Sequence, residues 1–267
     1  MVLSVGLIGC GSIGAAVLAA IDGGALDDVA CDSVLVRRRR EDGAVDRRFA
    51  TDIERFLEPG LDLVVDCAGH DALRAYGPRA LSHGLDLMTL SMGAFFDDTL
   101  YQDLVRRADA SGAKLLLLSG AVGALDILSA AAEGGLESVE IAVAAPWTTL
   151  TETPAARTVD LTALAVPTTV FRGTVRDGVE HYPHTANIAA AVALAGLGLD
   201  ETTLEVRARP DEDGYSVTVT ATGNFGRFRL EEEMKLDPTT RTKVAPLVAW
   251  AVLKSIRQYA AAVKIGR

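Results

Sequence analysis

Apolar and polar positions follow two different rhythms along this chain of 267 residues. Up to about residue 120, short continuous apolar runs alternate with longer mixed stretches. Such runs are typical of parallel strands buried on both faces. They predict strands at 2–8, 34–36, 61–67, 86–90 and 113–118, with helices at 15–21, 72–82 and 98–110. This alternation predicts a doubly wound parallel sheet.

From about residue 136 the apolar residues recur with period two, which favours an antiparallel sheet with one covered face. Strands are predicted at 139–143, 204–208 and 215–222, with a further strand at 227–236. Small residues at 187–197 predict a helix among these strands. A last helix is predicted at 243–264, with Pro246 in its first turn, where a missing N–H costs little.

A glycine motif, Gly-Cys-Gly-Ser-Ile-Gly at 9–14, stands between the first strand and the first helix. Gly9 permits a tight turn, Gly11 lets the backbone approach a pyrophosphate, and Gly14 lets the helix pack close to the strand. The N–H groups at the start of such a helix attract phosphate. A glycine turn without a ligand is the alternative. We expect dinucleotide binding by Gly9, Gly11, Ser12, Ile13 and Gly14.

The end of the second strand bears on the choice of dinucleotide. An NAD site usually carries Asp or Glu there, about 20 residues after the glycines, to bind the ribose 2′-OH. This chain has Arg37-Arg38-Arg39-Arg40, and no carboxylate precedes Glu41. A guanidinium suits the 2′-phosphate of NADP, so we expect Arg37 and Arg38 to bind NADP, with NAD or dual use left open. A solvated basic loop is the alternative.

Small residues follow three other predicted strands of the first sheet, where ligands of such sheets bind. The segments are Cys-Ala-Gly-His at 67–70, Ser-Met-Gly-Ala at 91–94 and Ser-Gly-Ala-Val-Gly at 119–123. Ordinary glycine turns are the alternative. We expect a flat cofactor ring to approach Cys67, Ala68, Gly69, Ser91, Gly93 and Ala121.

The chain has four histidines. His70 follows the terminus of the predicted strand at 61–67, and His184 directly precedes the small-residue helix. Both are candidates for an acid or base near neutral pH, or else hydrogen-bonded structural residues. His83 is expected to cap a helix or lie at the surface, and His181 to be exposed.

Composition narrows the class of protein. No run of 18 uncharged apolar residues occurs, so no membrane span is expected, and the chain starts as a core strand rather than as a signal peptide. Three cysteines in or beside apolar segments predict thiols in a reducing cytoplasm and show no metal-site spacing, so no metal is expected. The net charge of −10 argues against nucleic acid as a partner.

Several motifs make the chain resemble the L-aspartate dehydrogenases over nearly its full length. They are Asp-Cys-Ala-Gly-His at 66–70, Leu-Ser-Met-Gly-Ala at 90–94, Leu-Ser-Gly-Ala at 118–121, Tyr-Pro at 182–183 with the alanine-rich 187–196, and Gly-Asn-Phe-Gly at 223–226. The resemblance implies oxidation of L-aspartate to iminosuccinate with NAD or NADP, and a homodimer. It implies a Rossmann domain over 1–120 with a returning helix within 240–267, and an α+β catalytic domain with a largely antiparallel sheet over 121–239. The active site is expected in the cleft between the two.

The chain departs from the family's pattern at four places in its second half. Gly-Tyr-Ser-Val at 214–217 replaces an Asn-x-His signature whose histidine is regarded as catalytic, and Ala-Ala-Pro-Trp at 144–147 replaces Arg-Lys-Pro. Asp-Pro-Thr-Thr-Arg at 237–241 replaces Asn-Pro-Lys-Thr-Ser, and Thr185 replaces the first asparagine of Asn-x-Asn, whose second is Asn187.

Two hypotheses follow. In the first, the protein is an NAD(P)-dependent dehydrogenase of an amino acid or its imine, with His184 as acid or base and Asn187 orienting the substrate or the nicotinamide amide. In the second, it binds nucleotide as a redox sensor or partner subunit without dehydrogenase activity.

Overall fold

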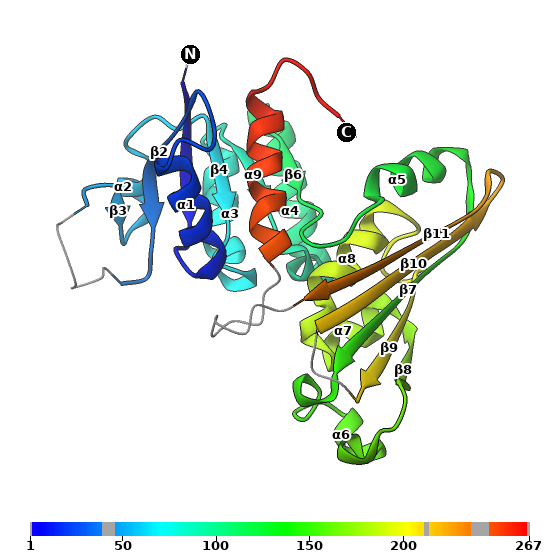
Figure 1. The fold of residues 1–267 in the computed structure, drawn as a ribbon. Coiled ribbons are helices and arrows are strands. Elements are labelled where there is room, and N and C mark those ends of the chain that lie inside the picture. Colours follow the sequence, from blue (N-terminus) through cyan, green and yellow to red (C-terminus); the bar gives the residue numbers. More distant parts are fainter. Residues whose placement is uncertain (1, 39–45, 211–213, 236–245, 266–267) are drawn as a thin grey trace. The chain divides into compact units, whose positions relative to one another are not determined.

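The computed structural model describes residues 2–38, 46–210, 214–235 and 246–265. The chain divides into two compact units, Met1–Gly120 with Leu247–Arg267, and Ala121–Pro246. Each unit has its own sheet, and the two units are described separately below (Figure 1).

The first unit contains a six-stranded sheet in the order β3-β2-β1-β4-β5-β6. Every neighbouring pair is parallel, which confirms the predicted doubly wound sheet. The strands are β1 (Leu3–Ile8), β2 (Val29–Leu35), β3 (Phe49–Ala50), β4 (Leu63–Asp66), β5 (Asp86–Thr89) and β6 (Leu115–Leu117).

Helices connect these strands, and the apolar runs of β1, β2 and β4 form the centre of the core. The connecting helices are α1 (Ser12–Asp22), α2 (Ile53–Leu57), α3 (His70–Ser82), the 3₁₀ helix η1 (Met92–Phe96) and α4 (Asp98–Ser111). Val5, Leu7 and Val65 are fully buried in one apolar cluster. Burial of each such side chain contributes on the order of 1.5–3 kcal/mol to folding.

The last helix, α9 (Pro246–Ala260), packs on this same unit. Val252 and Ile256, one turn apart, are buried in the cluster that holds the strands. The Tyr259 hydroxyl donates to Asp86 Oδ2 at 2.9 Å. The helix ends at residue 260 and not at 264 as predicted, and the predicted start at 243 lies outside the described residues.

The second unit contains a five-stranded sheet in the order β11-β10-β7-β9-β8. The sheet is mostly antiparallel, as predicted, but β7 and β9 pair in parallel. The strands are β7 (Leu136–Pro146), β8 (Thr168–Thr174), β9 (Thr203–Arg209), β10 (Gly214–Gly223) and β11 (Gly226–Lys235).

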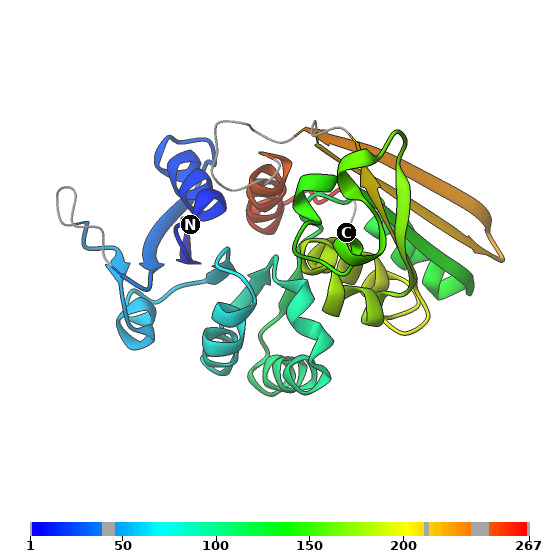
Figure 2. The ribbon, with the colours of Figure 1, turned by 90° about the horizontal axis from the view of Figure 1, so that it is seen from below.

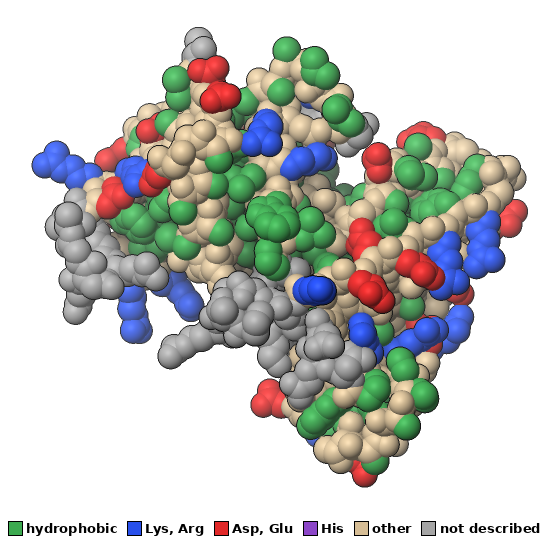
Figure 3. All heavy atoms as spheres, viewed as in Figure 1, with side chains coloured by type: hydrophobic (Ala, Val, Ile, Leu, Met, Phe, Trp, Pro, Cys, Tyr) green, Lys and Arg blue, Asp and Glu red, His purple; other side chains and the backbone are tan. Residues whose placement is uncertain are grey.

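Helices cover one face of this second sheet (Figure 2). Ala189, Ala190 and Ala193 of α8 are fully buried, and their small side chains let the helix lie close to its neighbours. The opposite face is polar, with basic and acidic side chains interspersed over β10 and β11 (Figure 3). The helices of this unit are α5 (Leu125–Gly134), η2 (Trp147–Thr149), α6 (Ala155–Thr158), η3 (Leu161–Ala163), α7 (Val175–His181), η4 (Pro183–Thr185) and α8 (Ala186–Ala195).

None of the helices in the described ranges is both long and apolar enough to cross a membrane.

Candidate functional site

The glycine motif forms the turn between β1 and α1. Gly9 has a φ of +92°, and a Cβ there would lie 2.6 Å from the Cβ of Ala68. A Cβ on Gly14 would lie 2.1 Å from the carbonyl oxygen of Gly9. Both contacts are far inside van der Waals distance, so the protein's own packing requires glycine at these two positions.

Gly11 differs from both. Its φ is −76°, which any residue can adopt, and a Cβ there would meet nothing within 4 Å. Gly11 is the N-cap of α1, no side chain caps the helix at that position, and the first turn holds no acidic residue. The chain itself therefore does not need glycine here, whereas an anion approaching the helix N-terminus does.

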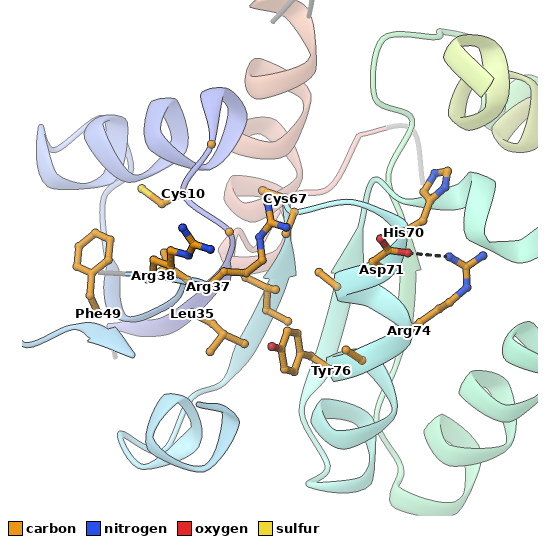
Figure 4. Close-up of a pocket in the computed structure, with 17 residues that line it drawn as sticks. Cys10, Leu35, Arg37, Arg38, Phe49, Cys67, His70, Asp71, Arg74 and Tyr76 are labelled. Carbon is orange, nitrogen blue, oxygen red and sulfur yellow. Dashed lines mark hydrogen bonds and ion pairs between the residues drawn. The ribbon is translucent and has the colours of Figure 1, made fainter. Parts of the chain in front are cut away.

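A cleft of about 1140 Å³ opens beside this turn, within the first unit (Figure 4). Its walls come from the turn, the end of β2, the end of β4 and the first turns of α3. It is lined by Ile8, Gly9, Cys10, Gly11, Leu35, Val36, Arg37, Arg38, Phe49, Cys67, Ala68, His70, Asp71, Ala72, Arg74, Ala75 and Tyr76.

Three guanidinium groups line the cleft. Arg37 and Arg38 follow β2 and are exposed, and neither has an ion-pair partner among the described residues. Arg74 on α3 is 3.5 Å from Asp71 Oδ1. In a chain of net charge −10, this local excess of positive charge favours an anionic ligand.

A buried carboxylate holds the strand ends beside the cleft. Asp66 is fully buried and accepts hydrogen bonds from Thr89 Oγ1 at 2.8 Å, Ser91 Oγ at 2.5 Å and the Ala68 N–H at 3.0 Å. Burial raises the pKa of the Asp66 carboxyl, while these donors favour its ionised form. The network joins the ends of β4 and β5 to the turn that brings Ala68 against Gly9.

The cysteines near the turn are packing residues. None of Cys10, Cys31 and Cys67 forms a disulfide. Burial raises the pKa of the Cys67 thiol, so it stays protonated at neutral pH.

Among the described residues, no three His, Cys, Asp or Glu side chains are grouped so that they could hold a metal ion.

The predicted site residues fall into three groups. Those that line the cleft are Gly9, Gly11, Arg37, Arg38, Cys67, Ala68 and His70. Those of the first unit that do not line it are Ser12, Ile13 and Gly14 at the start of α1, Gly69 at the N-cap of α3, Ser91 and Gly93. Those of the second unit are Ala121, His184 and Asn187.

Two of these residues, Gly69 and Ser91, have a structural role of their own. Gly69 has a φ of +102°, a conformation that favours glycine. The Ser91 side chain is 2% exposed, and its hydroxyl donates to Asp66.

The histidines occupy different settings. His70 is the first residue of α3, is half-buried and lines the cleft. His184 lies in η4, just before α8, on which Asn187 is exposed. His83 is the C-cap of α3, with Nδ1 2.9 Å from the Arg79 carbonyl oxygen, and His181 is exposed at the end of α7.

Sequence reasoning missed the contribution of α3. Ala72, Ala75 and Tyr76 line the cleft at i, i+3 and i+4 spacing, which places them on one helix face. Phe49, Asp71 and Arg74 also line it and were not predicted. The sequence could have indicated this contribution. A helix that follows a parallel strand begins at the carboxyl end of that strand, where ligands of such sheets bind, so one of its faces is expected to line the binding site.

Comparisons with known proteins show which family the chain resembles. Residues 126–259 match the family model described as aspartate dehydrogenase, C-terminal, and residues 9–118 match the model described as homoserine dehydrogenase, NAD binding domain. An L-aspartate dehydrogenase of Cupriavidus taiwanensis is 38% identical over 98% of this chain and 100% of its own. One from Ruegeria pomeroyi is 40% identical over 97% of this chain and 94% of its own.

Solved structures share the fold. Aspartate dehydrogenase from Thermotoga maritima has a TM-score of 0.77 at 20% identity, with both chains fully covered. A hyperthermophilic archaeal homoserine dehydrogenase, solved in complex with NADPH, has a TM-score of 0.62 at 12% identity, also with full coverage.

Proposed function

The chain belongs to the L-aspartate dehydrogenase family, and we propose that it prefers NADP(H) when it moves a hydride to or from the α-carbon of an amino acid or its imine. The protein is an NAD(P)-dependent oxidoreductase. When bound, the nicotinamide accepts the hydride from the amino acid, and the resulting imine hydrolyses to the keto acid and ammonia.

Gly11 is the observation that carries the cofactor assignment. Gly11 has no side chain, which leaves open space at the N-terminus of α1, where no side chain caps the helix, on the wall of the cleft. Nothing in the chain's own packing accounts for glycine at this position. A pyrophosphate bound by the N–H groups of α1 accounts for it directly.

Arg37 and Arg38 support NADP over NAD. They line the cleft where an NAD-specific site carries a carboxylate, and no described side chain neutralises them. A 2′-phosphate supplies the charge and the oxygens that a guanidinium binds in pairs. The structure of a distant relative in complex with NADPH is in keeping with this choice.

The chemical step needs an acid or base, and we assign this role to His184. An amine that becomes an imine loses protons, and a neutral imidazole can accept one near pH 7. Asn187, exposed on the following helix, would orient the substrate or the nicotinamide amide. The family's usual histidine is absent after position 184, so no later histidine competes for the role.

Turnover on a defined panel tests the function. We expect the purified protein to reduce NADP⁺ with L-aspartate or another amino acid of the panel, and to oxidise NADPH with the matching keto acid and ammonia. Tight NADPH binding without turnover on any member would instead favour the redox sensor or partner subunit, a hypothesis motivated by the replacement of the Asn-x-His signature at 214–217.

His184→Ala tests the acid–base assignment. Losing a positioned proton-transfer group should lower kcat about 10²–10⁴-fold and remove the imidazole limb of the pH–rate profile, with NADPH affinity nearly unchanged. His181→Ala, at an exposed position three residues earlier, is the matched control and should keep kcat. A fall of only two- to threefold, with the same pH profile, would make His184 structural and His70 the next candidate.

Two further properties stay predictions. The family resemblance implies a homodimer, which light scattering would measure. The thiols and the composition favour the cytoplasm.

A further inference from the structure

A carboxyl group stands on the covered face of the second sheet, where apolar side chains are expected. β10 and β11 lie side by side in antiparallel register, with Val217 directly opposite Glu232 (Figure 1). Side chains at directly opposed positions share one face of a sheet, and Val217 is buried, so Glu232 lies on the face that the helices cover. Its chain neighbours Glu231 and Glu233 are exposed on the polar face.

Half of the Glu232 carboxyl lacks a partner. Oε1 accepts the Gly123 N–H at 2.8 Å, whereas Oε2 is buried and has no hydrogen-bond partner among the described residues. Burial raises the pKa of this carboxyl, and the Gly123 N–H opposes that rise. A buried carboxyl oxygen without a donor costs folding free energy, so its presence in a native protein calls for a functional explanation.

We propose that Glu232 is a further proton-transfer residue, whose carboxylate binds the α-ammonium group of the substrate and takes one proton from it as the imine forms. The inference rests on the proposed function, because it assigns a second group of the same reaction. His184 keeps the other proton transfer, at the water that attacks the imine.

The hydrogen bond to Gly123 ties Glu232 to the segment that follows β6. This segment is the run Ser-Gly-Ala-Val-Gly at 119–123, and ligands of parallel sheets bind beyond the carboxyl ends of the strands. Consecutive Cα atoms are 3.8 Å apart, so Gly123 lies within about 8 Å of Ala121, which is expected to approach the cofactor ring. The carboxyl is therefore anchored to the part of the chain where the reacting groups are expected.

The register of the sheet gives a second observation. Gly-Tyr-Ser-Val at 214–217 stands where the family has Asn-x-His, and Val217, the last residue of this run, is opposite Glu232. The Cβ atoms of directly opposed residues are about 4.5–5.5 Å apart. The chain thus has no imidazole at the end of this run, but it carries a proton-accepting group on the adjacent strand and the same face.

The proposed step balances without a further reactant. The ammonium nitrogen gives one proton to the Glu232 carboxylate and so gains a lone pair. The α-carbon gives up its hydrogen, with both electrons of the C–H bond, to the nicotinamide, and the nitrogen lone pair closes the C=N bond. The products are the protonated imine, the reduced cofactor and a neutral carboxyl, which returns its proton to solvent.

The terminal torsion of a glutamate has a broad energy minimum, so a half-buried carboxyl can turn an oxygen toward the substrate. A raised pKa also suits the role, because a general base acts best when its pKa lies near the working pH.

Turnover of the intact protein tests the role. Glu232→Gln keeps the size of the side chain but cannot take the proton at neutral pH, so kcat should fall about 10²–10⁴-fold with NADPH affinity unchanged. Glu233→Gln makes the same change of charge at the next position, on the polar face, and should keep kcat within twofold.

The pH profile gives a readout that a structural role would not move. The base must be ionised, so the wild-type rate should fall as pH falls through the pKa of Glu232, which lies above the ordinary value of about 4.3 for glutamate. Glu232→Gln should lose this acid-side limb, and Glu232→Asp, which keeps a carboxyl, should retain it.

Binding isolates the contact with the ammonium group. L-aspartate and succinate carry the same two carboxylates, but succinate has no ammonium group. In the presence of NADPH, which prevents turnover, Glu232→Gln should weaken L-aspartate at least about fivefold, because it removes a hydrogen bond between charged groups, and leave succinate within twofold. Another amino acid that the panel identifies is compared with its own deamino analogue.

Glu232→Leu separates the role from folding. Leucine suits the covered face and removes the unpaired oxygen, so NADPH affinity should stay at the wild-type value while kcat falls as in Glu232→Gln. Retained kcat in Glu232→Gln, an unchanged acid-side limb, or equal weakening of L-aspartate and succinate overturns the role of Glu232 and leaves the dehydrogenase assignment intact. Absence of turnover by wild type on every member of the panel overturns the proposed function itself.

Discussion

The three glycines of the turn between β1 and α1 are needed for different physical reasons. At Gly9 and Gly14 an added Cβ would collide with the chain, whereas at Gly11 it would point into open space. Loss of binding without loss of folding is therefore expected at Gly11 alone. The sequence motif alone does not distinguish a glycine required by the packing of the chain from one required by a ligand, because the same residue type stands at all three positions.

Gly11→Val is the corresponding prediction. The side chain would occupy the path of the pyrophosphate, so NADPH binding should fall at least about 100-fold, equivalent to about 2.7 kcal/mol, while the free energy of unfolding changes by about 1 kcal/mol or less. Titration with NADPH and urea unfolding measure the two effects.

Gly24→Ala is the control for that variant. Gly24 has a φ of +73° and no neighbour within 4 Å of a Cβ, so alanine there should cost stability but not binding. Unchanged NADPH affinity in Gly11→Val would show that the turn is not the phosphate site.

Arg37→Asp tests the choice of dinucleotide. A carboxylate at this position repels a 2′-phosphate and can bind a 2′-OH, so we expect NADP(H) affinity to fall and NAD(H) affinity to stay or improve. The ratio of the two dissociation constants is the measurement. Arg106→Asp on α4, which lies outside the cleft, controls for the change in net charge. An equal loss for both cofactors would contradict the assignment.

At the scale of elements, the start of α5 carries a strained residue. Ala124 is the N-cap of this helix with φ +58°, one of two non-glycine residues with positive φ among those described. The left-handed conformation costs a residue with a Cβ on the order of 1–2 kcal/mol. Gly123, just before it, donates its N–H to Glu232 Oε1 at 2.8 Å, and a Cβ there would lie 2.6 Å from the same oxygen, at the end of a flexible side chain.

Ala124→Gly should therefore stabilise the protein. The strain free energy removed by glycine is larger than the additional entropic cost of ordering glycine on folding. The free energy of unfolding should therefore rise by about 0.5–1 kcal/mol. Ala110→Gly, at an exposed position within α4, should lower it by about 0.5–1 kcal/mol. Urea unfolding of both variants is the check, and a destabilised Ala124→Gly would show that no such strain exists.

The hydrophobic pattern of the sequence predicted some helices and strands and missed others. Strands such as β1 and β4 are buried on both faces, so their apolar runs revealed them. β3 has two residues and β8 has no fully buried position, and neither was predicted, because a half-exposed strand leaves little hydrophobic signal. The short α7 was missed for a related reason, since seven residues give fewer than two turns of periodicity.

At the scale of the whole molecule, charge is distributed unevenly. The chain carries a net charge of −10, yet Arg37, Arg38 and Arg74 line one cleft. A ligand with an additional phosphate gains more from these groups than one without it, and mobile ions screen that gain.

Salt should therefore weaken NADPH binding more than NADH binding. Between about 0.05 M and about 0.5 M NaCl the Debye length falls from more than 10 Å to less than 8 Å, which screens the exposed guanidinium groups. The ratio of the two dissociation constants should move toward one, and Arg37→Asp should remove most of this dependence. Parallel salt curves for the two cofactors would contradict a 2′-phosphate site at these arginines.

The sequence by itself determined the local unit of strand, glycine turn and helix, and the α/β class that follows from it. These features depend on residues within about twenty positions of one another, so their pattern is visible along the chain. Only the tertiary structure decided that Tyr76 and Leu35 line the same cleft, that Ser91 donates to the buried Asp66, and that β7 pairs in parallel with β9. Those contacts join segments distant in sequence, and their partners are selected by packing and hydrogen bonding in the folded chain, which no local pattern records.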